Sequence, residues 1–184
     1  MDQGEKKIET EIEFINHASV LIRGEKISVL SDPWYEGDVF HKGWNLLTET
    51  SDQNAKEILD RTTHIWLSHE HPDHFSIPFF KKFAEKIKER QIEILFQETK
   101  DKRVINFLKK DGHSCTELKF NHSQRLHDDF FVTCIKDGFY DSGLLVVNGN
   151  EKILNLNDCE VTTDNRAKEV LSITGKVDVL LTQF

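Results

Sequence analysis

The stretch HIWLSHEHPDH at residues 64–74 decides the fold of this chain. Its first part, residues 64–68, is an apolar run with the length of a buried strand. Its second part, HEHPDH at residues 69–74, places five side chains with metal-binding donors within six residues. Zinc, iron and manganese accept imidazole and carboxylate ligands, and such ions lower the pKa of a bound water from about 16 toward about 7. The stretch therefore predicts a metal site that makes a nucleophile without a serine or a cysteine.

Length and charge limit the class of protein. The chain has 184 residues, of which 38% are hydrophobic and 13 are Phe, enough for one domain with a substantial core. We expect a single domain over residues 1–184. The formal net charge of −8 argues against non-specific binding of nucleic acid, because phosphates attract clusters of Lys and Arg. A small-molecule substrate is expected, and an anionic one is compatible with a metal ion that supplies positive charge.

Three features concern the location of the protein and its last residues. Residues 1–7 are polar and no span of about 18 apolar residues occurs, so neither a signal peptide nor contact with a membrane is expected. Cys115, Cys134 and Cys159 form no CxxC pair, which favours a reducing, cytoplasmic setting and thiols packed in the core. Residues 177–184 have the pattern of a buried strand. We expect a domain that is truncated at this end or completed by a partner chain.

The predicted elements fall into two comparable halves. In the first half, Thr50 and Gln53 have the spacing of a capping box, and Ser76 is expected to cap a helix that buries Phe79. Strand meanders need antiparallel pairing, so two sheets sandwiched between outer helices fit better than one doubly wound sheet. We therefore predict a mixed α/β fold. The expected strands are 8–15, 18–23, 26–31, 64–68, 92–97, 115–120, 130–136, 143–147, 152–157 and 177–184, and the expected helices are 51–61, 76–87, 101–110 and 163–171.

Beyond these general features, the chain resembles one known family. The HxHxDH pattern within residues 69–74 is the signature of the metallo-β-lactamase superfamily. Two more segments resemble this family: NHASV at residues 16–20, which leads to SDPW at 31–34, and ILNLNDC at 153–159. Residues 37–47 resemble the β-lactamase-like domain of CMP-N-acetylneuraminate hydroxylases.

The resemblance implies an αββα sandwich with one or two divalent metal ions, of zinc, iron or manganese, at one edge. It further implies that His69 and His71 ligate one ion, that Asp73 and His74 ligate the other, and that Asp158 bridges them. The chemistry of the residues is compatible with these roles. Asp73 in addition suits the role of general base toward a metal-bound water.

Two further polar residues are candidates for catalysis. His17 and Asp32 lie in otherwise apolar strands, and buried polar groups require a reason. The resembling families place equivalents near the active site. The alternative is structural: the two side chains form a mutual or backbone hydrogen bond that ties the first strands together.

The chain departs from the family pattern at two places. Family members usually place a third histidine just before the strand that begins at residue 143, where this chain has none. Either Asp141 or Tyr140 supplies an oxygen ligand instead, or the site binds its ion weakly. A further family histidine normally lies beyond residues 177–184. His122 and His127 are spare histidines, and we interpret both as solvated loop residues.

Three functions remain open at this stage. The first is a metal-dependent hydrolase that uses a metal-activated water on an ester, lactone or phosphoester. The second is an iron-dependent oxygenase component that acts on a nucleotide sugar such as CMP-sialate and requires a separate electron donor, because the chain has no Rieske signature. The third is a metal-poor, non-catalytic binding subunit, which the two missing histidines favour. Residues 34–47 either cover the metal edge or pack against the first strands.

Overall fold

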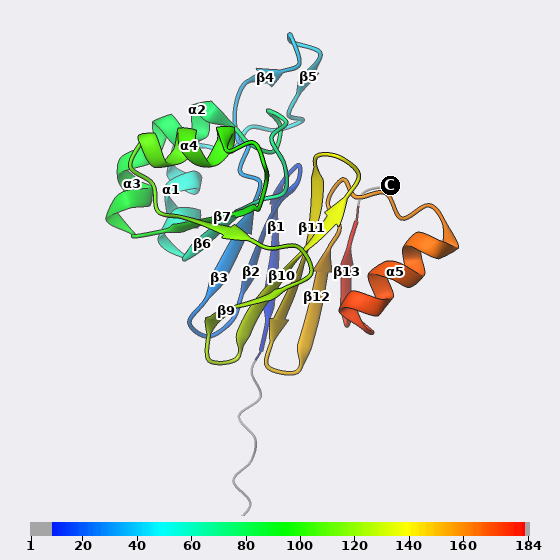
Figure 1. Ribbon diagram of the computed structural model, residues 1–184. Helices are drawn as coiled ribbons and strands as arrows, with labels where there is room; N and C mark the ends of the chain where they lie inside the picture. Colours follow the sequence, from blue (N-terminus) through cyan, green and yellow to red (C-terminus); the bar gives the residue numbers. More distant parts are fainter. Residues whose placement is uncertain (1–8, 183–184) are drawn as a thin grey trace, which may run out of the picture.

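The computed structural model describes residues 9–182, which form two β-sheets packed face to face with helices on both outer sides (Figure 1). This arrangement confirms the predicted αββα sandwich. The first sheet contains, in spatial order, β1 (Glu11–Asn16), β2 (Ser19–Arg23), β3 (Ser28–Ser31), β6 (His64–Leu67), β7 (Glu93–Gln97) and β8 (Cys115–Leu118). The second contains β13 (Val179–Leu181), β12 (Glu151–Asn155), β11 (Asp141–Asn148), β10 (Phe130–Asp137) and β9 (Ser123–His127).

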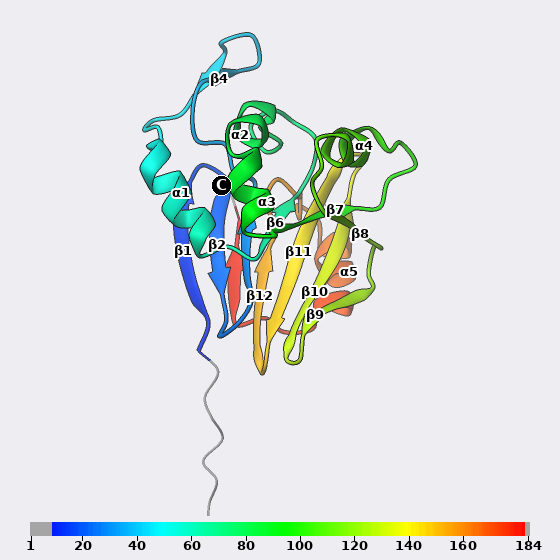
Figure 2. The ribbon, with the colours of Figure 1, turned by 90° about the vertical axis from the view of Figure 1, so that its left-hand side faces the viewer.

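Helices connect the parallel strands of the first sheet and cover its outer face. Strands β1, β2 and β3 form the expected antiparallel meander, whereas β3, β6, β7 and β8 pair in parallel. Parallel pairing needs crossover connections, and helices provide them on one side of the sheet (Figure 2). These helices are α1 (Asp52–Asp60), α2 (Ile77–Lys82), α3 (Ala84–Glu89) and α4 (Arg103–Lys110), and α5 (Asp164–Thr174) covers the second sheet.

Three apolar clusters hold these layers together. Trp66 on β6 is fully buried between the two sheets, whereas its neighbours Ile65 and Leu67 pack under the helices. The first sheet is therefore buried on both faces, which explains the continuous apolar run that the sequence shows there. The third cluster lies between α5 and the second sheet and includes Val170 and Cys159, so Cys159 is a core residue as expected.

The helix ends agree with the sequence in one case and differ in another. Ser76 caps α2 as expected, since its side chain accepts a hydrogen bond from the backbone N–H of Phe79. The capping box at Thr50 is wrong: Ser51 is the N-cap of α1, and Thr50 Oγ1 accepts a hydrogen bond from Asn16 instead. The expected helix after Ser76 is divided, because α2 ends at Lys82 and α3 begins at Ala84.

One edge strand and one short hairpin were not expected from the sequence. Residues 123–127 form β9, the exposed edge strand beside β10, where a loop was expected. A short hairpin of β4 (Asp38–Val39) and β5 (Trp44–Asn45) projects from the molecule between β3 and α1 (Figure 1). The first strand begins at Glu11; Ile8, where we expected it to begin, lies outside the described residues, as do the last two residues of the expected terminal strand. None of the described helices is long and apolar enough to span a membrane.

Candidate metal centre

Parallel pairing brings the candidate residues to one edge of the sandwich. Strands β3 and β6 run side by side, with Ser31 opposite Trp66. The carboxyl ends of both strands therefore meet, and the polar segments that follow them, Asp32 and residues 68–74, lie next to each other. Side chains from the β1–β2 turn, from β11 and from the segment after β12 reach the same place.

His69, His71 and Asp141 form the first group of donor atoms. His69 Nε2 lies 2.8 Å from His71 Nδ1 and 3.5 Å from Asp141 Oδ1. Asp141 is the first residue of β11, directly at the position where the sequence lacked a histidine. The structure thus places a carboxylate beside the two histidines. Tyr140, the other expected oxygen donor, is half exposed, and its ring centroid lies 6.4 Å from that of His71.

Asp158 lies between the first group and His74. Its Oδ2 is 3.3 Å from His74 Nε2 and 3.9 Å from His69 Nε2. One carboxylate oxygen thus faces a histidine from each half of the loop, which is the arrangement expected for a bridging ligand. Asp158 is within reach because β12 ends at Asn155 and the chain turns toward the metal loop.

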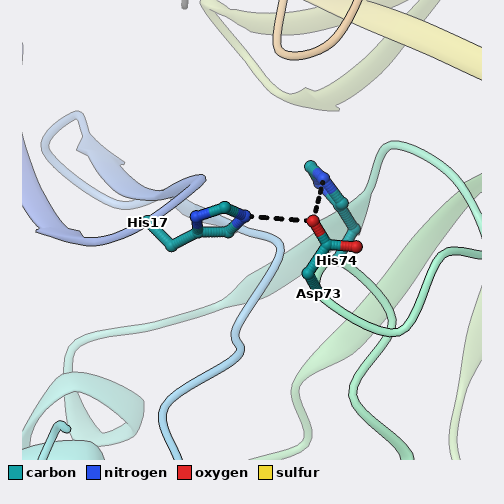
Figure 3. A group of neighbouring side chains, drawn as sticks. All are labelled: His17, Asp73 and His74. Carbon is teal, nitrogen blue, oxygen red and sulfur yellow. Dashed lines mark hydrogen bonds and ion pairs between the residues drawn. The ribbon is translucent and has the colours of Figure 1, made fainter. Parts of the chain in front are cut away.

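The second group consists of His17, Asp73 and His74 (Figure 3). Both imidazoles point at the same carboxylate oxygen: His17 Nε2 lies 3.2 Å and His74 Nε2 lies 3.3 Å from Asp73 Oδ2. His17 comes from the turn between β1 and β2, more than fifty residues before the loop that carries the other two. The structural alternative for His17, a hydrogen bond within the first strands, is wrong because its partner is Asp73.

Asp32 contacts the Nδ1 side of His74, whose Nε2 faces Asp73 and Asp158. Its side chain is fully buried and accepts hydrogen bonds from the backbone N–H and the hydroxyl of Ser68, from His74 Nδ1 and from the amide of Asn157. An Asp at this position orients His74 and increases the basicity of the ring. The catalytic role expected for Asp32 stays a prediction, and its contacts are those of a residue that positions His74.

Ser68, Gln97 and Asn157 are functional positions that the sequence analysis missed. The carbonyl of Ser68 accepts hydrogen bonds from Gln97 Nε2 at 2.9 Å and from the hydroxyl of Ser142 at 2.6 Å, which fixes the start of the metal loop. The side chains of Ser68, Gln97, Ser142 and Asn157 are all buried. The signal available in the sequence was weak: a polar residue at the end of each buried strand, where a partner is required.

The ionisable side chains of the candidate centre shift one another's pKa values. Burial opposes protonation of His74, but hydrogen bonds with Asp158, Asp32 and Asp73 outweigh it and raise its pKa to about 12. Burial and the proximity of His74 lower the pKa of His69 to about 4, so His69 is neutral at pH 7. Burial also acts on Asp73, yet hydrogen bonds from His17 and His74 hold its pKa well below the usual range. Burial and the carboxylate of Asp158 raise the pKa of Asp141.

The donor set fits a divalent cation. Three carboxylates converge here, and their mutual repulsion calls for positive charge. One oxygen of Asp73 and one of Asp141 are buried and form no hydrogen bond within the described residues. Such buried, unsatisfied oxygens are costly unless an ion or a water contacts them. Imidazole and carboxylate are donors that zinc, iron and manganese accept.

The remaining predicted features lie around this centre. The ring centroid of Phe40 in the β4–β5 hairpin lies 6.0 Å from that of His71, and the hydroxyls of Tyr35 and of Ser19 on β2 form a hydrogen bond at 3.0 Å. Both alternatives for residues 34–47 are thus partly correct, because this region contacts the metal loop and the first strands. His122 and His127 belong to no group of metal donors within residues 9–182.

The comparisons with known proteins agree with this geometry. Residues 11–183 match the model of the β-lactamase superfamily domain. The chain belongs to this superfamily. Curated relatives include the cytidine monophosphate-N-acetylneuraminic acid hydroxylases of Danio rerio, 28% identical over 96% of this chain, and of Macaca mulatta, 30% identical over 96%. The chain spans 29% of the length of each.

Solved structures share the fold at low identity. CmlA, a diiron β-hydroxylase from Streptomyces venezuelae, superimposes with a TM-score of 0.70 and 18% identity, covering 96% of this chain and 35% of that chain. A "possible metal-dependent hydrolase" from Veillonella parvula gives a TM-score of 0.64 and 15% identity, covering 89% of this chain and 66% of that chain. These likenesses show the fold alone, which hydroxylases and hydrolases share.

Proposed function

We propose that this domain is the metal-binding part of an iron-dependent oxygenase that hydroxylates an anionic small molecule, with a nucleotide sugar as the first substrate to test. The observation that carries the proposal is the group of His69, His71 and Asp141. Two histidines and one carboxylate with open positions form the ligand set typical of non-haem iron oxygenases. The carboxylate stands where the chain lacks the third histidine of its family.

The relatives support the same chemistry. The curated hydroxylases act on a CMP-linked sugar according to their name, and they match this chain over almost its whole length. In hydroxylation, one atom of dioxygen is inserted into a C–H bond to give C–OH. The other atom leaves as water, formed with two electrons from a separate reductant and two protons from solvent. Bound iron would supply the activation of dioxygen.

A cavity beside the first donor group supports an anionic substrate. It has a volume of about 520 Å³ and lies between the metal loop, the start of α4 and the β10–β11 turn. Lys100, Arg103 and Lys136 line it together with Glu70, Glu98 and Asp101. Arg103 pairs with Glu70 at 3.1 Å and with Asp101, whereas the Lys136 ammonium lies 5.9 Å from the ring of Phe120. An anionic group that enters next to Lys136 would gain from its ammonium, and the carboxylates would limit where that group lies.

The residues of the chain then have separate tasks. His69, His71 and Asp141 would hold one ion, and Asp73 with His74 would hold a second. Asp158 would bridge the two, because its carboxylate faces both His69 and His74. Buried hydrogen bonds of Ser68 with Asp32 and Gln97 anchor the start of the metal loop, so the donors of this loop are preorganised.

A hydrolase is the second candidate. Asp73 favours it: its Oδ1 is buried and makes no hydrogen bond in the described part of the chain, so it would be available to accept the proton of a water that the metal activates. The two proposals differ in what turnover requires. An oxygenase needs a reductant and dioxygen, whereas a hydrolase needs neither.

The test uses the full-length gene product, purified without oxygen and loaded with Fe²⁺, Zn²⁺ or Mn²⁺. CMP-sialate is added with and without a reductant and dioxygen, and generic phosphodiesters and lactones are assayed in parallel. We expect a product heavier by one oxygen atom, only with iron, reductant and dioxygen. Chelator-sensitive turnover that needs no reductant would support the hydrolase instead.

The matched variants are His69→Ala in the metal group and His122→Ala, an exposed histidine that belongs to no donor group in the described part of the chain. We expect His69→Ala to lose at least one metal ion and all turnover, and His122→Ala to keep both. Unchanged metal content in His69→Ala would contradict the proposal and favour a non-catalytic binding subunit.

A further inference from the structure

We infer that His17 is a protein ligand of the second metal ion, completing with Asp73 and His74 a second group of two histidines and one carboxylate. The inference rests on the proposed metal centre and extends it. It assigns the β1–β2 turn, which the HxHxDH signature does not include, to the coordination shell. The chain would then supply three ligands of its own to each ion, in addition to the bridging Asp158.

The distances between the donor atoms fit a shared ion. His17 Nε2 and His74 Nε2 lie 3.2 Å and 3.3 Å from Asp73 Oδ2, and the three atoms lie within 4.8 Å of one another. Two ligands bonded at about 2.1 Å are about 3.0 Å apart in an octahedral shell and about 3.4 Å apart in a tetrahedral one. Asp73 Oδ2 thus has both imidazole nitrogens at the separation that one ion requires. Figure 3 shows both rings directed at this oxygen.

The backbone at His17 is held in an unfavourable conformation. His17 and Ala18 form the two-residue turn between Asn16 and Ser19, which are paired across the hairpin. His17 adopts φ +46°, a region that glycine occupies without cost and that a residue with a side chain rarely occupies. Such strain persists where the surrounding structure imposes it, often at functional sites. Here it aims the imidazole at the metal loop.

Neighbouring side chains fix the imidazole in place. Trp34 and Trp44 contact the ring edge-on, with centroids at 5.1 Å and 6.4 Å. The His17 side chain is 29% exposed, so one side of it remains open to solvent and small ligands. A ring that is oriented on one side and accessible on the other is suited to hold an ion at the rim of the centre.

Asp73 gives an independent indication of a ligand. Its side chain is 95% buried, and its second oxygen, Oδ1, forms no hydrogen bond within residues 9–182. A carboxylate that served only to accept hydrogen bonds from His17 and His74 would leave this oxygen buried without a partner, which is unfavourable. An ion held by this group places positive charge next to both oxygens.

The competing explanation is that His17 only donates a hydrogen bond to Asp73. The variant His17→Gln separates the two, because a glutamine amide can still donate a hydrogen bond to Asp73 but is a poor ligand for these metals. His17→Ala removes both functions. His122→Ala is the control for loss of a histidine, since its ring nitrogen bonds only the carbonyl of Phe120 in the hydrogen bonds described.

The experiment measures Co²⁺ binding to the full-length protein by equilibrium dialysis and by visible absorption, which reports the ligands of cobalt directly. For the wild type and His122→Ala we expect two ions and the same spectrum. For His17→Ala and His17→Gln we expect the second ion to bind more than about a hundredfold more weakly, beyond the range for loss of an orienting partner. The spectrum of that ion should change as well. Added imidazole should restore both the affinity and the spectrum of the second ion in His17→Ala.

The outcomes are distinguishable. Two ions with an unchanged spectrum in His17→Gln would overturn the inference and leave the proposed function intact. Failure of imidazole to restore the spectrum of a folded His17→Ala variant, judged by circular dichroism, would also overturn it. Absence of cobalt from the wild-type protein would contradict the proposed function itself.

Discussion

Asp32 shows how one buried residue supports the whole centre. Its carboxylate is fully buried and receives four hydrogen bonds, from Ser68, His74 and Asn157. The sequence indicated that Asp32 lies near the site, because a carboxylate after an apolar strand needs partners. The sequence could not place it behind His74, since this depends on the pairing of β3 with β6. Asn157 was missed for the same reason.

Replacing Asp32 with Asn tests this support. The new NH₂ group has nearly the same shape, yet at the Oδ2 position it would face donors from Ser68, His74 and Asn157. We expect Asp32→Asn to lower the free energy of unfolding by about 3 kcal/mol, as when a buried charged pair is broken. Metal affinity should fall about 10- to 100-fold because His74 loses its orienting partner.

Urea unfolding and metal titration measure the two effects of Asp32→Asn. The control is Asp128→Asn, whose side chain is exposed and pairs only with Arg125 among the described contacts. This control should change neither quantity by a measurable amount. Wild-type metal affinity in Asp32→Asn would show that Asp32 is not needed to position His74.

Among the strands and helices, the sequence correctly located those that carry a clear apolar pattern. Strands that are buried on both faces and helices with an apolar stripe, such as α4, were located within a few residues. Strand β9, with the sequence SQRLH, was not, because an exposed edge strand carries few apolar side chains. The β4–β5 hairpin was also missed: each of its strands has two residues, and Phe40, His41 and Lys42 in its turn all adopt positive φ without being glycine.

The start of α1 gives a test at this scale. Ser51 accepts a hydrogen bond from the backbone N–H of Asn54 at 3.2 Å, so Ser51→Ala should lower the free energy of unfolding by about 1 kcal/mol. Gln53 would be essential in the capping box predicted from sequence, but in the structure it bonds the exposed Glu57. Gln53→Ala should therefore change stability by less than about 0.5 kcal/mol. Chemical denaturation measures the free energy of unfolding of both variants. A larger loss of stability for Gln53→Ala than for Ser51→Ala would support the capping box at Thr50.

At the scale of the whole molecule, the candidate centre joins segments that are distant in sequence. The β1–β2 turn, the metal loop, the start of β11 and the segment after β12 meet only when both sheets have formed and packed. The HxHxDH pattern identified one of these segments by itself, and the family resemblance supplied Asp158. Asp141 and Tyr140 were alternative oxygen donors, and the structure places Asp141 Oδ1 3.5 Å from His69 Nε2. The direct contact of His17 with Asp73 was not predictable, because it depends on the conformation of a turn.

Because the ligands come from both sheets, metal binding should stabilise the whole fold. An ion that binds only the folded state adds about 2.7 kcal/mol at a free concentration of 100 times Kd. For a chain of this length, that corresponds to a rise of about 5 to 10 °C in the melting temperature. Calorimetry with metal and with a chelator measures the difference. We expect His122→Ala to respond as the wild type does and His69→Ala to show a much smaller shift. An equal melting temperature in metal and in chelator, for protein shown to contain metal, would mean that the ligands do not hold the two sheets together.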